Sequence, residues 1–417
     1  MTIELDILRG LWLYEEPAGS YATDNSSAFP TGFLAVPYKE GTLSAQRLQK
    51  MLDPMAAKIR ADGHSKKVLG PKGSKVGFTV PMHSHGSSLH GVAALPTTST
   101  WALMRLLSAV MGATSSRTSG GATTVQAGTT ATVVNVTAGR GADFERGQAI
   151  ACEVSASSPA LEAREILSIA TDAITVKEAF SATPVTGTDV RGSVTFYPTE
   201  DPDTSLQLIA EGRESSDRWV HRGLQGGFKI AMKIGDGEIP EIAFDLEGAT
   251  YGILSAQAPN ALSYGVFTPF SSTYAELTVP TVGATTRVKV EQSAVSIEPD
   301  FRYGSVKSGG GTETVSRKRR QATRPLVKGS FTVPFEDGTW ETARSAREDR
   351  AFFQQLGNAA GGMWLISAPT IQIVDVQGAA SDEGVAGQVV SWEGRHDESA
   401  LASTTALTYA ALRIHAF

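Results

Sequence analysis

Cysteine is nearly absent from the sequence, since Cys152 is the only one among 417 residues. A single thiol cannot form a disulfide within the chain, and it cannot supply a zinc site built from several cysteines. This cysteine usage favours folding in a reducing cytoplasm. Cys152 lies in the apolar segment 149–154, where we expect a buried, inert thiol in a β-strand.

Long apolar runs are also missing. The most apolar stretch, residues 101–113, is too short to span a bilayer and contains Arg105. The first residues lack the basic start and apolar core of a secretory signal. We therefore expect no membrane anchor and no export by the usual route.

An excess of basic residues is missing as well, because the net charge is −6. Tight binding of nucleic acid needs a basic face that neutralises phosphates. The charge balance therefore disfavours a protein whose whole surface holds DNA or RNA. Local basic segments remain compatible with it.

Catalytic motifs are not apparent. The sequence has neither a Gly-x-Ser-x-Gly elbow nor a His-Glu-x-x-His motif, and its acidic residues show no spacing typical of general acid–base pairs. Residues 70–75, Gly-Pro-Lys-Gly-Ser-Lys, lack the spacing of a phosphate-binding loop, and Pro71 removes one backbone donor. We expect no enzyme activity and no cofactor.

Four histidines form the most tempting metal site. His83, His85 and His90 lie close together, and His64 precedes them. Imidazoles could bind zinc or nickel, but no acidic general base lies in the same stretch. We favour a polar connection between a strand and a helix, with metal binding as the alternative.

Glycine is abundant, at 42 residues, and Thr, Ser and Val are frequent. Apolar residues make up 41% and charged residues 19% of the chain, so it can bury a core. This composition is typical of many short strands joined by tight turns. We predict a mainly β protein.

One four-residue motif occurs twice. Phe-Thr-Val-Pro stands at residues 78–81 and again at 331–334, each time in a strand-like segment. A tryptophan follows each copy, and we predict a helix after each one. The first helix, residues 101–111, has apolar residues at helical spacing and ends at Gly112. Thr98, Ser99 or Thr100 is expected to cap it.

The second helix is predicted over residues 340–356. Thr339 is its expected cap, Phe352, Phe353 and Leu356 its apolar stripe, and Gly357 its end. A strand pair then follows each helix. In the first copy the strands are residues 228–234 and 242–246, joined by the turn signal at 235–237. In the second copy they begin at Ile371 and Val390, and 377–387 link them.

The pattern predicts an internal duplication. Glu247-Gly248 and Glu393-Gly394 close the second strand of each pair in the same way. A chance likeness between two ordinary hairpins is the alternative. We assign residues 1–114 with 196–256 to the first unit and residues 257–417 to the second unit.

An extra segment interrupts the first unit. Residues 115–195 contain short apolar stretches at 133–136, 149–154, 166–169, 174–176 and 190–196, with turn residues between them. Their spacing predicts a small inserted β barrel or sandwich. The Ser-, Thr- and Gly-rich residues 114–124 are its expected entry linker.

Basic residues precede each Phe-Thr-Val-Pro motif, in segments that we expect to be long loops. A solvated loop, a nucleic-acid patch and a contact with an acidic surface on a neighbouring subunit are the three interpretations. We favour the subunit contact, because such complementarity guides register and orientation. The predicted contact residues are Lys66, Lys67, Lys72, Lys75, Arg317, Lys318, Arg319, Arg320, Arg324 and Lys328.

These features together resemble the tail tube, or major tail, proteins of long-tailed bacteriophages. Residues 11–21, Leu-Trp-Leu-Tyr-Glu-Glu-Pro-Ala-Gly-Ser-Tyr, resemble the first strand and turn of that family. Residues 76–81, the helix after them and the Gly-Asp-Gly-Glu-Ile-Pro-Glu-Ile-Ala-Phe-Asp-Leu-Glu-Gly run at 235–248 resemble its central features. The resemblance covers the first unit best. It implies two tandem β sandwich units, each with one flanking helix.

The resemblance also implies a function. Six such units form a ring, and stacked rings form the conduit for DNA ejection. Two units per chain would make a homotrimeric, pseudo-hexameric ring. The implied partners are further copies of the chain and the tape-measure, tail terminator and tail-tip proteins, while double-stranded DNA passes without specific binding. We expect assembly in the host cytoplasm and a final place in the virion, with the inserted domain outside the tube and an excess of carboxylates in its lumen.

Other functions stay open at this point. A minor tail or tail-tip protein is one, and a tube of a contractile or secretion-type machine is another. An outer inserted domain would obstruct the sheath of such a machine. A host-surface protein that binds glycans through the inserted domain is the alternative from a different class.

Overall fold

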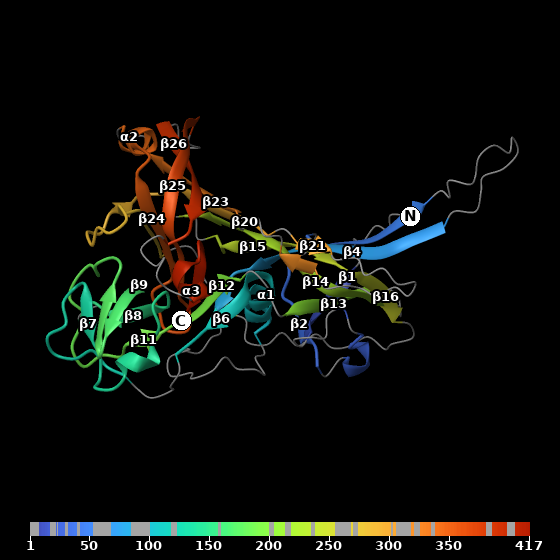
Figure 1. Ribbon diagram of the computed structural model, residues 1–417, viewed down its shortest axis with the longest axis horizontal. Coiled ribbons are helices and arrows are strands. Elements are labelled where there is room, and N and C mark those ends of the chain that lie inside the picture. The colour runs from blue at the N-terminus through green and yellow to red at the C-terminus, as the bar shows by residue number, and fades with distance from the viewer. Residues whose placement is uncertain are drawn as a thin grey trace, which may run out of the picture.

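The computed structural model describes residues 8–16, 22, 24–29, 32–39, 42–52, 68–84, 101–117, 123–156, 160–199, 204–212, 218–234, 238–254, 268–269, 274–301, 303–305, 318–320, 326–334, 338–380, 386–397 and 405–417. In these residues the protein is mainly β, as the composition predicts. Figure 1 shows long strands running across the molecule, with a smaller separate sheet beside the C-terminal half.

One long run of antiparallel strands forms the backbone of the fold. Eight strands lie side by side in the order β3, β4, β15, β14, β20, β23, β26 and β25. Their bounds are β3 Ser44–Leu52, β4 Val68–Pro81, β15 Glu241–Gly248, β14 Arg218–Lys233, β20 Ala294–Asp300, β23 Leu326–Pro334, β26 Ala386–Arg395 and β25 Trp364–Ala380. We call this run the eight-strand layer.

One face of the eight-strand layer is buried and the other is open. Along β4, Val76, Phe78 and Val80 are buried, while Gly77 and Thr79 between them are partly exposed. Side chains alternate between the two faces of a strand, so this pattern places the core on one side. The buried side chains belong to one large core cluster that extends through both halves of the chain.

A second layer covers that core. The long strands β14 and β25 enter both layers, because their first halves pair with a different set of strands. Around β14 these are β13 (Ser205–Gly212) with β1 (Leu8–Glu16) on one side and β16 (Thr250–Leu254) on the other. Around β25 they are β24 (Asp349–Leu356) with β18 (Ala275–Thr278), and β27 (Arg413–Ala416).

The strand order is the same around β14 and around β25. Even an irregularity recurs: the pairing of β13 with β14 shifts register between Leu206 and Leu208, and that of β24 with β25 shifts between Arg350 and Phe352. The motif strands match too, since Phe78 lies opposite Phe244 and Phe331 lies opposite Val390.

The first predicted helix is confirmed. It is α1 (Ala102–Met111), and almost all of its side chains are buried. Gly112 ends it with φ 97°, a left-handed conformation that favours glycine. Trp101 occupies the N-cap position and its side chain does not cap the helix, while the predicted caps Thr98, Ser99 and Thr100 lie outside the described residues. Instead, Trp101 packs its ring 5.4 Å from that of Trp364 in the second half.

The second predicted helix is wrong beyond its first turns. α2 covers only Thr339–Ala346, Gly338 rather than Thr339 is its N-cap, and Arg347 ends it with φ 53°. Residues 349–356 form β24, and every residue from 351 to 356 is buried. A strand buried on both faces shows no alternation of polar and apolar residues, so its apolar run resembles the apolar stripe of a helix.

The predicted hairpins are confirmed as strand pairs. β14 pairs with β15, and β25 pairs with β26, both antiparallel. β25 continues to Ala380, so the connection is shorter than the predicted link 377–387. The turn residues 235–237 lie outside the described residues.

The inserted segment forms a five-stranded sheet of its own. Its strands pair in the order β11, β8, β9, β10, β7. Their bounds are β7 Val133–Asn135, β8 Ala149–Glu153, β9 Leu161–Ala170, β10 Ala173–Val176 and β11 Arg191–Gly192.

A separate apolar cluster fills the core of the inserted segment, including Cys152, Ile166 and Phe180. Gly139, Gly147, Thr171 and Gly187, which stand between the strands, have positive φ. The strand predicted over 190–196 is divided between β11 and β12 (Val194–Pro198), and β12 pairs with β27 and β6 (Gly112–Ser115).

The inserted sheet packs against the second half of the chain. Ala149, Ala151, Leu161 and Ala163 share a core cluster with β24 and β25 residues and with Phe417. Gln355 adds main-chain contacts, because its side chain accepts from the N–H of Ala163 at 2.9 Å and donates to the carbonyl of Leu161 at 2.9 Å. The contact lies on the second layer, away from the open face.

The remaining elements are short. They are η1 Ser26–Ala28, β2 Leu34–Ala35, β5 His83–Ser84, η2 Gly141–Asp143, β17 Thr268–Pro269, β19 Lys289–Val290, β21 Tyr303–Ser305, β22 Lys318–Arg320 and α3 Ala406–Tyr409. No helix within the described residues is both long enough and apolar enough to cross a membrane.

Candidate assembly surfaces

The open face of the eight-strand layer carries charges of both signs. They stand on the outward positions of six neighbouring strands, from β4 to β26. The cations are Lys75, Lys229, Lys233, Lys328 and Arg395, and the anions are Glu241, Asp245, Glu247, Glu298, Asp300 and Glu393. The described part of this face is therefore close to neutral, and neither sign dominates it.

Ion pairs join most of these charges across neighbouring strands. Lys75 Nζ lies 2.9 Å from Asp245 Oδ2, and Lys328 Nζ lies 3.8 Å from Glu393 Oε1. Lys229 pairs with Glu298 in the same manner. The hydrogen bond to Asp245 raises the pKa of Lys75. Exposed pairs contribute little to stability, but each one occupies a cation that could otherwise hold a phosphate.

Lys75 and Lys328 occupy matching places. Each stands three residues before the phenylalanine of a Phe-Thr-Val-Pro motif, and each lies opposite a glutamate, Glu247 or Glu393. The open face therefore repeats its polar pattern as well as its strands.

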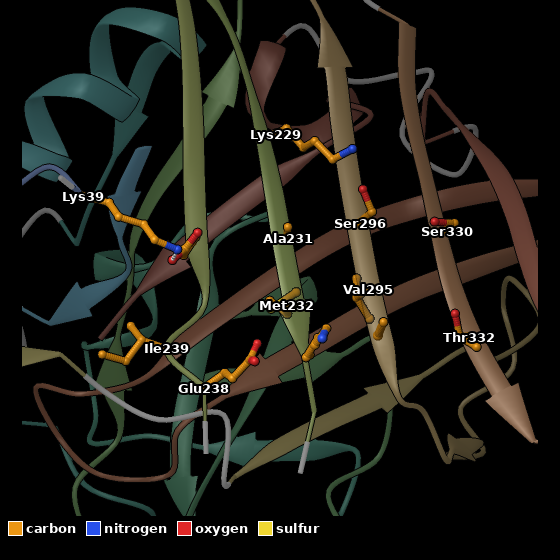
Figure 2. A pocket seen from close by; sticks show the side chains of 13 residues that line it. Lys39, Lys229, Ala231, Met232, Glu238, Ile239, Val295, Ser296, Ser330 and Thr332 are labelled. Carbon is orange, nitrogen blue, oxygen red and sulfur yellow. Dashed lines mark hydrogen bonds and ion pairs between the residues drawn. The ribbon is translucent and has the colours of Figure 1, made fainter. Parts of the chain in front are cut away.

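A shallow depression lies on this face where the two halves meet. It has a volume of about 660 Å³ and spans β14, β20 and β23. Figure 2 shows Ala231 and Ser296 facing each other across the junction of β14 and β20, with Ser330 and Thr332 on the next strand. The lining combines small or hydroxyl side chains with charged ones, which include Lys229, Lys233 and Glu241.

The two ends of the eight-strand layer are open edges. β3 pairs with β4 on one side, and among the described strands none pairs with its other side. At the opposite end, β24 covers β25 only as far as Gln372. Within the described part of the chain, the same edge of residues 374–380 has no partner strand. Val376 donates its N–H to its neighbour Asp375 at 3.0 Å instead.

The predicted contact residues do not form one loop surface. Lys72 and Lys75 lie within β4, and Lys328 lies within β23, where we expected loops. Lys318, Arg319 and Arg320 form β22, which pairs with β21. Lys66, Lys67, Arg317 and Arg324 lie outside the described residues. A role of these residues in contacts between subunits stays a prediction.

Of the four histidines in the alternative metal site, the structure describes only His83. This side chain is buried, its Nδ1 lies 2.9 Å from the carbonyl of Pro81, and burial lowers its pKa. His64, His85 and His90 lie outside the described residues. Among the residues that the structure describes, no group of three or more His, Cys, Asp or Glu could hold a metal ion.

A buried polar network joins the inserted sheet to the second half. Arg413 Nη1 lies 2.5 Å from Glu165 Oε1, and Lys177 Nζ lies 2.9 Å from the same oxygen. Lys177 also contacts Asp397 at 2.5 Å. Burial opposes the charge of Glu165, but Arg413 and Lys177 outweigh it and lower the pKa of this carboxyl.

Ser367 and His415 extend this network. Ser367 Oγ lies 3.0 Å from His415 Nε2, and Thr195 Oγ1 lies 2.9 Å from Nδ1. Burial lowers the pKa of His415 to about 3, so its ring is neutral. A serine beside a histidine and a carboxylate is the residue set of many hydrolases. Here the side chains have almost no exposed surface and cannot touch a dissolved substrate, so we interpret the network as structural.

Burial also raises the pKa of the Cys152 thiol far above its ordinary value, which keeps it protonated and unreactive.

A scan of the sequence against models of protein families gives no match, and a search of curated proteins gives none either. The chain's own strands and side chains therefore carry the functional argument.

Two features of the site could not be read from the sequence. The open edges of β3 and β25 depend on which strands pair, and the Arg413–Glu165 contact joins residues far apart in the chain. The repeated Phe-Thr-Val-Pro motif was the one signal that pointed toward the first of these.

Proposed function

We propose that this chain is a structural protein that assembles with copies of itself into rings, and that stacked rings form the tail tube of a long-tailed bacteriophage. The observation that carries the proposal is the eight-strand layer, in which one set of four strands is followed by a second set in the same order. A chain that already joins two such sets can join a third by the same contact.

The correspondence between the two sets supports an internal duplication. In chain order, β1, β2, β3, β4, β13, β14, β15 and β16 match β18, β19, β20, β23, β24, β25, β26 and β27 in their pairings. The recurrent bulge, whose extra residue lies on β14 in one half and on β25 in the other, belongs to this list. Two unrelated hairpins would have no reason to share it, so we infer two tandem sandwich units.

Open strand edges provide the reason to assemble. An edge exposes unpaired N–H and C=O groups, and closure into a barrel removes every edge. β3 at one end and β25 at the other end are the edges that a neighbour would satisfy. If a ring holds six units, as the resemblance implies, three chains complete it.

The open face suits the wall of a DNA channel. Its lysines at 75, 229 and 328 are paired with carboxylates, so a passing phosphate finds few free cations. The described part of this face is close to neutral, and an excess of carboxylates in the lumen stays a prediction. Charge pairing would serve the same purpose, because DNA must slide without being held.

The inserted sheet is compatible with this arrangement. It packs on β24 and β25 in the second layer, opposite the open face. It would therefore stand outside the tube and leave the channel clear. A tape-measure protein inside the tube, a terminator and tip proteins at its ends, and a place in the virion are implied by the resemblance alone.

Electron microscopy of the purified protein over a range of concentrations tests the proposal. We expect hollow rings of uniform diameter and, at high concentration, stacked rings. Sedimentation of the same samples should show one assembled species well above the mass of one chain. A protein that stays a monomer at every concentration and never forms a hollow particle would contradict the proposal.

A further inference from the structure

The junction between the two units gives a template for the contact between chains. β14 and β20 pair with Ile230 opposite Ile297, Ala231 opposite Ser296 and Met232 opposite Val295. β14 belongs to the first unit and β20 to the second, so this is already a contact between units. We call it the internal seam.

The strands that match the internal seam are the two open edges. β25 matches β14, because Phe228 opposite Phe244 corresponds to Val376 opposite Val390. β3 matches β20, because Ser44 opposite Gly77 corresponds to Ser296 opposite Ser330. The two strands that are free at the ends of one chain are thus the counterparts of the two strands that pair in its middle.

We propose that β25 of one chain pairs antiparallel with β3 of the next, with Gly378 opposite Ala45 and Ala379 opposite Ser44. This inference rests on the proposed function and names its contact. The partner is a second copy of this chain, because the internal seam shows which strand this edge accepts. The predicted register follows residue by residue from the internal seam.

The directions of the main-chain groups agree with this register. Across the internal seam the N–H of Ile234 donates to the carbonyl of Ser293 at 2.9 Å. Alternate residues of a strand point their N–H and C=O groups to the same neighbour. The groups of Met232 and Ile230 therefore also face β20, and those of their counterparts Ala380 and Gly378 face the open edge of β25.

The main-chain groups on the open edge of β3 also point in the direction that this register requires. The N–H of Met82 donates to the carbonyl of Pro240 at 2.7 Å, which sets the alternation along β4. The groups of Gly77 consequently face β3, and those of its partner Ser44 face β4. Ala45, the next residue, turns its N–H and C=O outward, toward the position predicted for Gly378.

Space is available at this edge. Gly378 is exposed, and a Cβ built on it would meet no atom within 4 Å. Ser44 is exposed on the open face.

The internal seam ends near Pro299, which has no N–H to donate. Its counterpart on β3 is Arg47, which has one, so the seam between chains can continue further along the strands.

A cross-link between engineered cysteines tests the register. Opposite residues outside the hydrogen-bonded pairs have Cα atoms about 4.5 Å apart, which a disulfide can bridge. Ala379 and Ser44 are such a pair, since their counterparts Ala231 and Ser296 lie between hydrogen-bonded pairs. The variant Ser44→Cys/Ala379→Cys should therefore cross-link neighbouring chains under mild oxidation. Cys152 is buried and should not interfere.

The matched control is Ser44→Cys/Gly378→Cys. In the proposed register these two side chains point to opposite faces of the sheet, and we expect at least tenfold less cross-linking. A register shifted by one residue would reverse the result. Mixing two chains that carry one cysteine each, Ser44→Cys and Ala379→Cys, should give only dimers, whereas the double variant should give a ladder that ends at the closed ring.

The outcomes separate this inference from the proposed function. Rings by electron microscopy without the Ser44–Ala379 cross-link would overturn the register and leave the tube proposal standing. Neither rings nor cross-links would overturn both. Cross-linked chains that form no hollow particle would support the strand pairing and contradict the tube.

Discussion

Trp392 fills the space in which a side chain at Gly329 would stand. The two residues lie opposite each other on β26 and β23, and a Cβ on Gly329 would overlap the indole ring. Their counterparts in the first half are Leu246 and Val76, which also lie opposite each other. A glycine facing tryptophan in one half thus replaces a valine facing leucine in the other.

This complementary pair leads to a first prediction. Gly329→Val alone should destabilise the protein by about 1–3 kcal/mol, because the added carbons force the buried indole aside. Trp392→Leu alone should cost about 2–5 kcal/mol through the cavity that it leaves. The double variant should recover part of the loss, since it recreates the Val76–Leu246 pair. Urea denaturation of the four proteins measures the coupling.

The matched control for this cycle is Lys328→Met with Trp392→Leu. Lys328 lies one residue away from Gly329 but points to the open face. Its change should therefore add to the loss from Trp392→Leu without any recovery. Strict additivity in the Gly329→Val/Trp392→Leu variant would show that the two halves of the chain do not share one packing scheme.

Much of the fold could be predicted where the residues of an element follow the helical or the strand period. Residues 102–111 show helical spacing, and the polar and apolar residues of 228–234 and 242–246 alternate. Residues 349–356 could not be predicted, because β24 is buried on both sides. Phe352 faces the main core, whereas Phe353 packs against the inserted sheet. The second face is apolar because of a segment almost two hundred residues earlier in the chain.

The candidate assembly surfaces were predictable only in part. The motif at Phe78 and Phe331 indicated two units, but a sequence does not show which strands remain unpaired. The basic residues Lys75 and Lys328 are evident in the sequence, but the prediction that they lie in loops is wrong. In a strand whose apolar residues alternate with polar ones, the charged residues stand on the open face. The alternation around Val76 and Phe78 indicates this position for Lys75.

The contact between Arg413 and Glu165 gives a second prediction. Both side chains are fully buried, so Arg413→Met would leave a carboxylate without its strongest partner. We expect a loss of about 3–5 kcal/mol. Lys328→Met, which removes an exposed ion pair with Glu393, should cost no more than about 1 kcal/mol. Urea denaturation compares the two variants.

A compensating change completes this test. Arg413→Met/Glu165→Gln removes the buried charge together with its partner and should recover part of the lost stability. If the double variant is as unstable as the sum of its single changes, the electrostatic explanation fails. The loss would then come from packing or from the bonds that Arg413 donates to the carbonyls of Leu407 and Thr408.

The neutral ring of His415 gives a third prediction, on pH. Its pKa is about 3 in the folded protein and about 6.5 in an unfolded chain. The unfolded state therefore binds a proton that the folded state refuses, and stability falls as pH drops from about 6.5 toward 3. The slope from this group is about 1.4 kcal/mol per pH unit.

Denaturation at pH 7, 6 and 5 isolates this effect. The lowered pKa of Glu165 concerns a lower range, because its stabilising charge is lost only below the ordinary carboxyl pKa. His415→Gln should be less stable than the unchanged chain at pH 7. On acidification, its free energy of unfolding should fall by about 1 kcal/mol less per pH unit. Equal pH slopes in the two proteins would show that His415 does not govern the acid sensitivity.

The open edge of β25 gives the last prediction. Proline at an edge position whose N–H faces outward leaves the chain's own ladder intact. Gly378→Pro should therefore fold normally, while it removes one hydrogen bond from each contact between chains and places a ring against the neighbour. One such bond is worth about 1 kcal/mol, so ring formation should need at least about fivefold more protein.

Ala379→Pro is the matched control, because the N–H of Ala379 faces β26 and its loss should lower the stability of the single chain. Sedimentation measures assembly and thermal unfolding measures stability, and rings of Gly378→Pro that form as readily as those of the unchanged chain would show that β25 is not the edge that recruits the neighbour.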